Sequence, residues 1–145
     1  MSDVVRGACY CGAVTVEVAA ALRPPVNCHC GQCRRLSGAA FTTWITARQD
    51  RVVLSGGHRL TRFAPTSRLL RHFCAVCGSH VFTSDARLPG TWGFPAGLFP
   101  GDQVSTPASD WFVSDKAPWY ALAGGTKCYG GPDGTEPMSG SASRD

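Results

Sequence analysis

Eight cysteines, grouped rather than scattered, constrain this chain more than any other feature of its sequence. Seven of them fall into three short runs, each compact enough to present two or three sulfurs to one point in space. The runs are Cys9 with Cys11, Cys28 with Cys30 and Cys33, and Cys74 with Cys77. Clustered thiols of this kind bind metal ions in a reducing compartment, whereas in a secreted protein they form disulfides.

The N-terminus, Met1-Ser2-Asp3-Val4, lacks the basic and apolar stretches of a secretory signal. No window approaches the 18 or so apolar residues that a membrane-spanning helix needs. We therefore expect a cytoplasmic protein without a membrane partner, in which metal binding is favoured and disulfides are the alternative.

The pairs Cys9–Cys11 and Cys74–Cys77 together supply four sulfurs, the usual ligand set of a closed, structural zinc site. Each pair is followed by a glycine, Gly12 or Gly78, which we expect to leave room for backbone amides near the sulfurs. Four sulfurs accommodate iron as well as zinc. The remaining alternative is a set of buried, unliganded thiols.

The run Cys28-His29-Cys30-Gly31-Gln32-Cys33 supplies only three sulfurs. Three protein ligands with a fourth position left for water or substrate distinguish a catalytic zinc from a structural one. The alternative is a second closed site completed by another side chain. The candidates for that fourth ligand are His29, His58, His72, His80 and the spare Cys128.

Spacing also leaves open a different partition, in which Cys9 and Cys11 join Cys28 and Cys30 around one ion. His29, between two candidate ligands, is expected either to move a proton or to orient a ligand. Arg34 and Arg35 are candidates to bind a substrate carboxylate. Four aromatic residues are expected in the core or in a pocket wall: Trp44, Trp92, Phe94 and Trp111.

The apolar pattern predicts a mainly β fold of short antiparallel sheets. Val14, Val16 and Val18 alternate with polar residues, as on a half-buried strand. Further strands are expected at 41–46, 51–55, 58–64, 68–73 and 79–83, followed by short strands and loops after Pro89. A turn or two of helix is expected over 31–36, ended by Gly38 in a left-handed conformation.

The length of 145 residues fits one domain, which we place at 1–129. Residues 130–145, rich in Gly, Pro and Ser, are predicted to be a disordered tail. The formal net charge of +4 falls to about +1 when seven thiolates hold two Zn²⁺ ions, so bulk charge indicates no nucleic-acid partner. The nearest basic stripe consists of Arg59, Arg62, Arg68, Arg71 and His72.

Read together, three motifs resemble those of the glutathione-dependent formaldehyde-activating enzyme and centromere protein V family. They are Cys9-Tyr10-Cys11-Gly12, the run from Cys28 to Arg34, and Arg71-His72-Phe73-Cys74-Ala75-Val76-Cys77-Gly78. The resemblance extends over residues 6–122 and includes Pro118-Trp119. The chain departs from the family pattern at Ser109-Asp110-Trp111-Phe112, where a histidine is expected before the aromatic residue.

The resemblance implies an Mss4-like β-tent built around zinc, with two Zn²⁺ per chain. Cys9, Cys11, Cys74 and Cys77 would hold the structural ion, and Cys28, Cys30 and Cys33 the catalytic one. The family's named activity joins glutathione to formaldehyde, and its members are classed as carbon–sulfur lyases for the reverse reaction. We therefore expect a zinc-dependent lyase acting on adducts of a small thiol such as glutathione with an aldehyde. The alternative is a non-enzymatic zinc module that binds a protein or nucleic acid.

Overall fold

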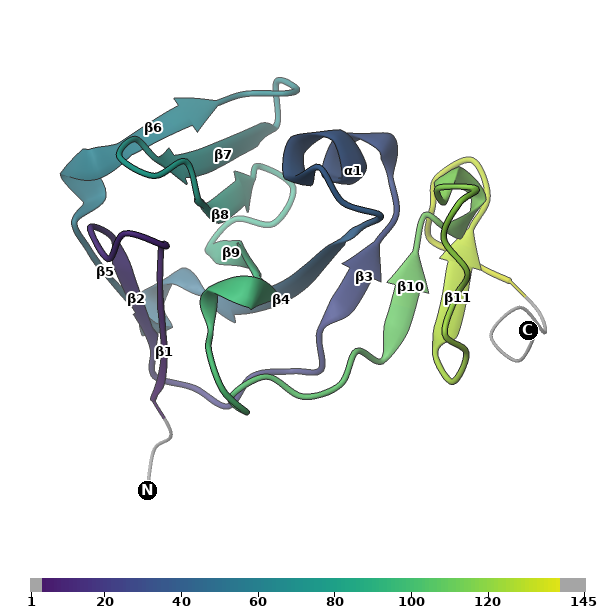
Figure 1. The fold of residues 1–145 in the computed structure, drawn as a ribbon, viewed down its shortest axis with the longest axis horizontal. Coiled ribbons are helices and arrows are strands. Elements are labelled where there is room, and N and C mark those ends of the chain that lie inside the picture. The colour runs from purple at the N-terminus through teal and green to yellow at the C-terminus, as the bar shows by residue number, and fades with distance from the viewer. Residues whose placement is uncertain (1–3, 139–145) are drawn as a thin grey trace. The chain divides into compact units, whose positions relative to one another are not determined.

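The computed structural model of the protein describes residues 4–138. Within them the chain forms two compact units, the first made of residues 4–23 and 45–104 and the second of residues 24–44 and 105–138. The fold is mainly β, as the sequence predicts (Figure 1). The organisation of residues 1–129 as one domain stays a prediction.

The first unit begins with a three-stranded antiparallel sheet in the order β1 (Val5–Ala8), β2 (Thr15–Val18) and β5 (Val52–Ser55). The valines at 14, 16 and 18 are at most 1% exposed, which confirms the alternation read from the sequence. Their burial beside Ile45 and Phe94 forms much of the core of this unit. Removing such side chains from water supplies most of the driving force for folding.

Four further strands of the first unit pair in succession as an antiparallel meander (Figure 1). They are β6 (Leu60–Phe63), β7 (Leu69–Cys74), β8 (His80–Asp85) and β9 (Thr91–Pro95). Phe82 stacks on Trp92 with ring centroids 4.1 Å apart, so Trp92 belongs to this packing and not to a pocket wall. One-turn 3-10 helices of this unit span Gln49–Arg51, Gly57–Arg59 and Ala96–Leu98.

The second unit is built around β3 (Val26–Cys28), which pairs on one side with the beginning of β4 (Thr42–Arg48) and on the other with β10 (Ser109–Trp111). Next to β10 lies β11 (Lys127–Gly130), followed by β12 (Glu136–Pro137). A 3-10 turn at Val113–Asp115 follows β10. Residues far apart in sequence therefore lie next to β3.

Helix α1 (Gly31–Ser37) follows β3 directly. Cys30 is its N-cap, and its sulfur accepts a hydrogen bond from the amide of Cys33 at 3.3 Å. Gly38 ends the helix with φ 69° and ψ 23°, which confirms the predicted left-handed stop. Among residues 4–138, no helix is both long and apolar enough to cross a membrane.

Two features differ from the sequence-based expectations. Strand β10 runs parallel to both β3 and β11, because long stretches of chain separate these strands and no hairpin fixes their direction. Part of the predicted disordered tail carries β12, which pairs with β11, and the Met138 amide donates to the Cys128 carbonyl at 3.0 Å. The tail prediction is based on the small number of apolar residues available for burial and does not consider such main-chain hydrogen bonds. Residues 139–145 of that prediction lie outside the described residues.

Gly56, which directly follows β5, has φ +81°, and a Cβ built on it would lie 2.0 Å from the Ala13 carbonyl oxygen. Gly56→Ala is therefore expected to lower the free energy of unfolding by roughly 2–5 kcal/mol, because the clash is with a backbone atom and the positive φ strains any residue that has a Cβ. The matched control is Gly57→Ala, whose Cβ would meet only Leu54 Cδ2 at 3.6 Å. Urea denaturation measures both variants, and equal stability would contradict the prediction.

Candidate metal centres

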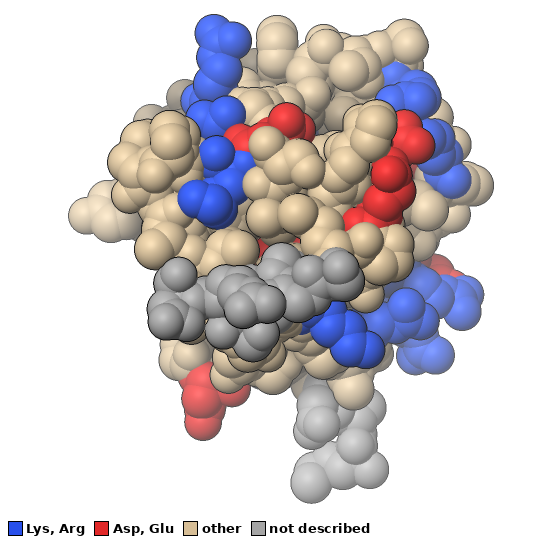
Figure 2. All heavy atoms as spheres, turned by 90° about the vertical axis from the view of Figure 1, so that its right-hand side faces the viewer, with Lys and Arg blue, Asp and Glu red and all other residues tan. Residues whose placement is uncertain are grey.

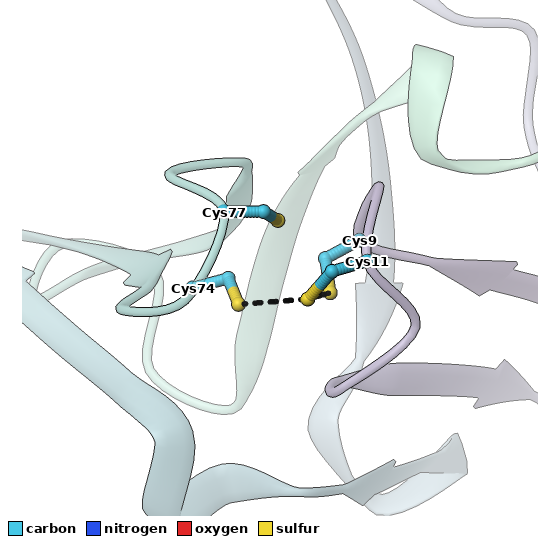
Figure 3. Close-up of side chains that lie close together, drawn as sticks. All are labelled: Cys9, Cys11, Cys74 and Cys77. Carbon is cyan, nitrogen blue, oxygen red and sulfur yellow. Dashed lines mark hydrogen bonds between the residues drawn. The ribbon is translucent and has the colours of Figure 1, made fainter.

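Four thiols of the first unit meet between two turns (Figure 3). Cys9 and Cys11 lie between β1 and β2, Cys74 is the last residue of β7, and Cys77 lies between β7 and β8. The four sulfurs are all within 4.8 Å of one another, with 3.6 Å from Cys9 to Cys11 and 3.8 Å from Cys11 to Cys74. Sulfurs at tetrahedral corners around one zinc ion lie about 3.8 Å apart, so this cluster has the dimensions of a metal site.

Backbone and hydroxyl groups hold the two turns in place. The Val14 amide donates to the Cys9 sulfur at 3.3 Å, and the Ser79 hydroxyl lies 3.2 Å from the Cys77 sulfur and accepts from the Tyr10 amide. The expected reason for the following glycines is wrong, because a Cβ on Gly12 or Gly78 would meet nothing within 4 Å. Both glycines have φ above +80°, so the turn conformation and not space explains them.

The thiols of this cluster, which we call the four-cysteine cluster, differ in acidity. Hydrogen bonds from the hydroxyl and amide of Ser79 lower the pKa of Cys77 to about 5. The Ala13 amide lowers the pKa of Cys11, but burial and the neighbouring thiols outweigh it and raise that pKa to about 11. Packed sulfurs cannot all become thiolates without a compensating cation. The donor set therefore fits a divalent ion that prefers thiolates, such as zinc.

Three thiols of the second unit form the other group, which we call the three-cysteine cluster. Cys28 is the last residue of β3, Cys30 caps α1, and Cys33 lies in the first turn of that helix. Their sulfurs are also within 4.8 Å of one another. The strand end and the helix start thus aim three donors at one point, and this arrangement can hold a metal ion.

The interior of the three-cysteine cluster disfavours negative charge in the absence of a cation. The pKa of Cys28 is raised well above its ordinary value, chiefly by hydrogen bonding with the sulfurs of Cys30 and Cys33 and further by burial. The carbonyl of Cys33 accepts from the hydroxyls of Ser37 at 2.7 Å and Thr42 at 3.2 Å, which anchors the third thiol. Like the four-cysteine cluster, this donor set fits a thiolate-preferring cation.

No other cysteine, histidine or carboxylate among the described residues of the second unit joins the three-cysteine cluster. His29 instead binds Asp110, with Nε2 to Oδ1 at 2.7 Å. Cys128 is buried elsewhere in the unit, 4.0 Å from the Thr126 carbonyl oxygen. None of the eight cysteines forms a disulfide in the described chain, which gives no support to the disulfide alternative. Cys9 and Cys11 gather with Cys74 and Cys77, and not with Cys28 and Cys30 as in the other partition.

Asp110 is the residue of this region that sequence reasoning did not assign a role. It is 5% exposed and accepts hydrogen bonds from Asn27, His29 and Thr126. One sequence signal was its place in the segment Ser109–Phe112, where the chain departs from the family pattern. Another is a carboxylate followed directly by two aromatic residues, because such a group is rarely buried without partners.

The remaining candidates divide between core and surface. Phe94 is fully buried in the core, and Trp111 stacks on Tyr129 with centroids 4.1 Å apart. Arg34 Nε donates to the His29 carbonyl at 3.3 Å, whereas Arg35 is exposed.

The nearest candidate for a basic stripe, named from the sequence, is not a continuous exposed surface. Arg71 and His72 are buried, and His72 stacks on Phe82 at 3.9 Å. Burial, and then the charge of Arg62, lowers the pKa of His72. On the face drawn in Figure 2, basic side chains lie next to acidic ones in more than one place. That face carries mixed charge, and the burial of Arg71 and His72 interrupts the candidate stripe elsewhere, so neither observation supports a nucleic-acid-binding surface.

Comparisons with known proteins point to one family. The model of the family "Glutathione-dependent formaldehyde-activating enzyme" matches residues 4–115. A protein of Halomonas elongata named "Putative glutathione-dependent formaldehyde-activating enzyme" is 30% identical over 93 residues, which is 59% of this chain and 59% of that protein. The chain thus matches about three-fifths of the length of that curated relative.

A solved structure is also similar. The crystal structure of a Rhodobacter sphaeroides protein superposes with a TM-score of 0.55 at 26% identity, covering 70% of this chain and 97% of that one. The region matched by the family model contains all seven clustered cysteines. This chain therefore belongs to the glutathione-dependent formaldehyde-activating enzyme family.

Proposed function

We propose that the protein is a zinc-dependent carbon–sulfur lyase-type enzyme that acts on adducts of a thiol with an aldehyde. Glutathione with formaldehyde, or a related pair, is the proposed substrate. The proposal rests on one observation, the three-cysteine cluster, whose sulfurs converge without a fourth protein ligand among the described residues of its unit. Family membership supports the choice of thiol and aldehyde.

The two clusters take different roles in this proposal. Cys9, Cys11, Cys74 and Cys77 hold a structural ion, because four protein sulfurs complete a tetrahedral site. Cys28, Cys30 and Cys33 hold the catalytic ion. When bound there, zinc supplies a positive charge that favours the thiolate form of a substrate thiol. A protein set of three thiolates keeps the site anionic overall, which suits C–S bond chemistry better than hydrolysis.

The overall reaction balances without a further reactant. In the forward direction the substrate sulfur bonds to the aldehyde carbon, and the thiol proton ends on the former carbonyl oxygen. In the lyase direction the C–S bond breaks, the carbonyl is restored and the sulfur regains a proton.

Residues of the chain hold the donor sulfurs in place, with Cys30 and Cys33 fixed by the first turn of α1 and Cys28 by β3. A cytoplasmic location stays a prediction from the sequence.

Mixing the zinc-loaded protein with glutathione and formaldehyde is expected to speed adduct formation at least about tenfold over the uncatalysed reaction, because effective enzymes exceed that acceleration by many orders of magnitude. Exchange spectroscopy by NMR measures the rate at equilibrium. Protein from which zinc has been removed by a chelator serves as the control. A metal-loaded protein that gives no acceleration would reject this substrate pair and favour a non-enzymatic module.

A further inference from the structure

A buried carboxylate ties together the segments around the three-cysteine cluster. Asp110 on β10 accepts from Asn27 Nδ2 at 3.2 Å, from His29 Nε2 at 2.7 Å and from Thr126 Oγ1 at 2.5 Å. These donors lie on β3, on the residue between two cluster cysteines, and just before β11. One side chain thus links three segments of the second unit.

The bond between Asp110 and His29 has a defined direction. Burial favours the neutral acid, but donors from His29, Thr126 and Asn27 outweigh it and hold the pKa of Asp110 below its ordinary value. An ionised carboxylate only accepts, so Nε2 of His29 carries the shared proton. Nδ1 of the same ring is buried without a hydrogen-bond partner in the described chain. Asp110 is therefore the hydrogen-bond partner on which this ring depends.

The ring and backbone of His29 are held from several sides. The side chain is fully buried, with the Phe41 ring centroid at 4.9 Å and that of Tyr120 at 6.0 Å. The His29 amide donates to the Trp111 carbonyl at 2.9 Å, and its carbonyl accepts from Arg34. His29 is the single residue between Cys28 and Cys30. Fixing its ring therefore fixes the turn that separates those two sulfurs.

We propose that Asp110 and His29 form a positioning pair that holds Cys28 and Cys30 at the spacing needed to bind one metal ion. The inference rests on the proposed metal site of the three-cysteine cluster but not on the proposed reaction. Neither residue is placed in contact with substrate. The carboxylate acts on the ring, and the ring acts on the turn, so the role belongs to the protein before substrate binds.

The test measures metal affinity without any substrate. Each variant is loaded with zinc or cobalt(II), and a chromophoric chelator competes for the ions. Asp110→Ala is expected to weaken the three-cysteine cluster's affinity roughly 10- to 100-fold and to leave the four-cysteine cluster unchanged, because the lost group orients ligands of one site only. Asp110→Asn is expected to retain much of the wild-type metal affinity that Asp110→Ala loses, since an amide oxygen can still accept from Nε2. The cobalt(II) absorption bands report the ligand geometry.

Two further variants keep the test decisive. His29→Phe retains a ring near Phe41 and Tyr120 but loses the Nε2 donor, so it is expected to weaken metal binding at the same site. It provides the test if Asp110→Ala does not fold. Asp115→Ala, at an exposed carboxylate of the same unit, is the matched control and is expected to bind like the wild type.

The positioning role is overturned if folded Asp110→Ala or His29→Phe binds both ions as tightly as the wild type. It is also overturned if both sites weaken equally, which would indicate general loss of structure. Melting temperatures in excess zinc identify that case. A protein with these affinity changes but no activity on glutathione and formaldehyde would reject the proposed reaction and leave the positioning role standing.

Discussion

Replacing Cys74 with serine is expected to abolish folding of the first unit and to lose the ion bound by the four-cysteine cluster. The apparent free energy of binding a structural zinc is about 10–16 kcal/mol in zinc-finger peptides, which equals or exceeds the whole stability of a typical domain. The cluster also joins turns that are separated by the 62 residues between Cys11 and Cys74. Circular dichroism and metal analysis of the purified variant measure the effect, and a strong chelator added to the wild type should reproduce it.

The matched control for this substitution is Cys128→Ser. Both cysteines are buried, 1% and 4% exposed, but Cys128 belongs to neither cluster. Burying its hydroxyl is expected to lower the stability by no more than about 3 kcal/mol, and the metal content should not change. If Cys74→Ser folds and melts like Cys128→Ser, the four-cysteine cluster is not a structural metal site.

Replacing Cys30 with serine is expected to separate function from folding. The metal content should fall from close to two ions per chain to about one, while the fold remains. Serine is a preferred N-cap, so its oxygen can replace the sulfur that accepts from the Cys33 amide at the start of α1. Activity on glutathione and formaldehyde should fall at least about 100-fold, because even residues that only orient metal ligands cost 10- to 100-fold when lost.

Cys128→Ser again supplies the comparison, with two ions and full activity expected. Two outcomes for Cys30→Ser would contradict the catalytic assignment. Unfolding like that expected of Cys74→Ser would make the three-cysteine cluster structural. Retention of two ions and of the wild-type rate would remove Cys30 from the metal site altogether.

The cysteine runs that make up the clusters could be recognised in the sequence because the spacing within each run is local information. Cys28, Cys30 and Cys33 lie within six residues, so any turn between a strand and a helix brings their sulfurs close. The strand containing Val16 and the helix ended by Gly38 were predictable for the same reason. Residue periodicity and capping act over a few residues and depend little on the rest of the chain.

The place of Asp110 could not be predicted in this way. It lies 81 residues from His29, and the two meet because β10 pairs in parallel with β3 in one register. A one-residue shift of that register would turn the carboxylate to the other face of the sheet. The burial of Arg71 and His72, read from the sequence as part of a basic stripe, likewise depends on packing.

The sequence by itself determined which residue types gather and the local geometry that each run can adopt. It thereby determined the mainly β fold and the three short runs of cysteines from which the clusters are built. Only the tertiary structure decided which distant segments meet, and so joined Cys9 and Cys11 to Cys74 and Cys77 and placed a carboxylate against His29. The physical reason is that pairing between distant strands is set by the cooperative burial of the whole core, to which each short segment contributes only a part.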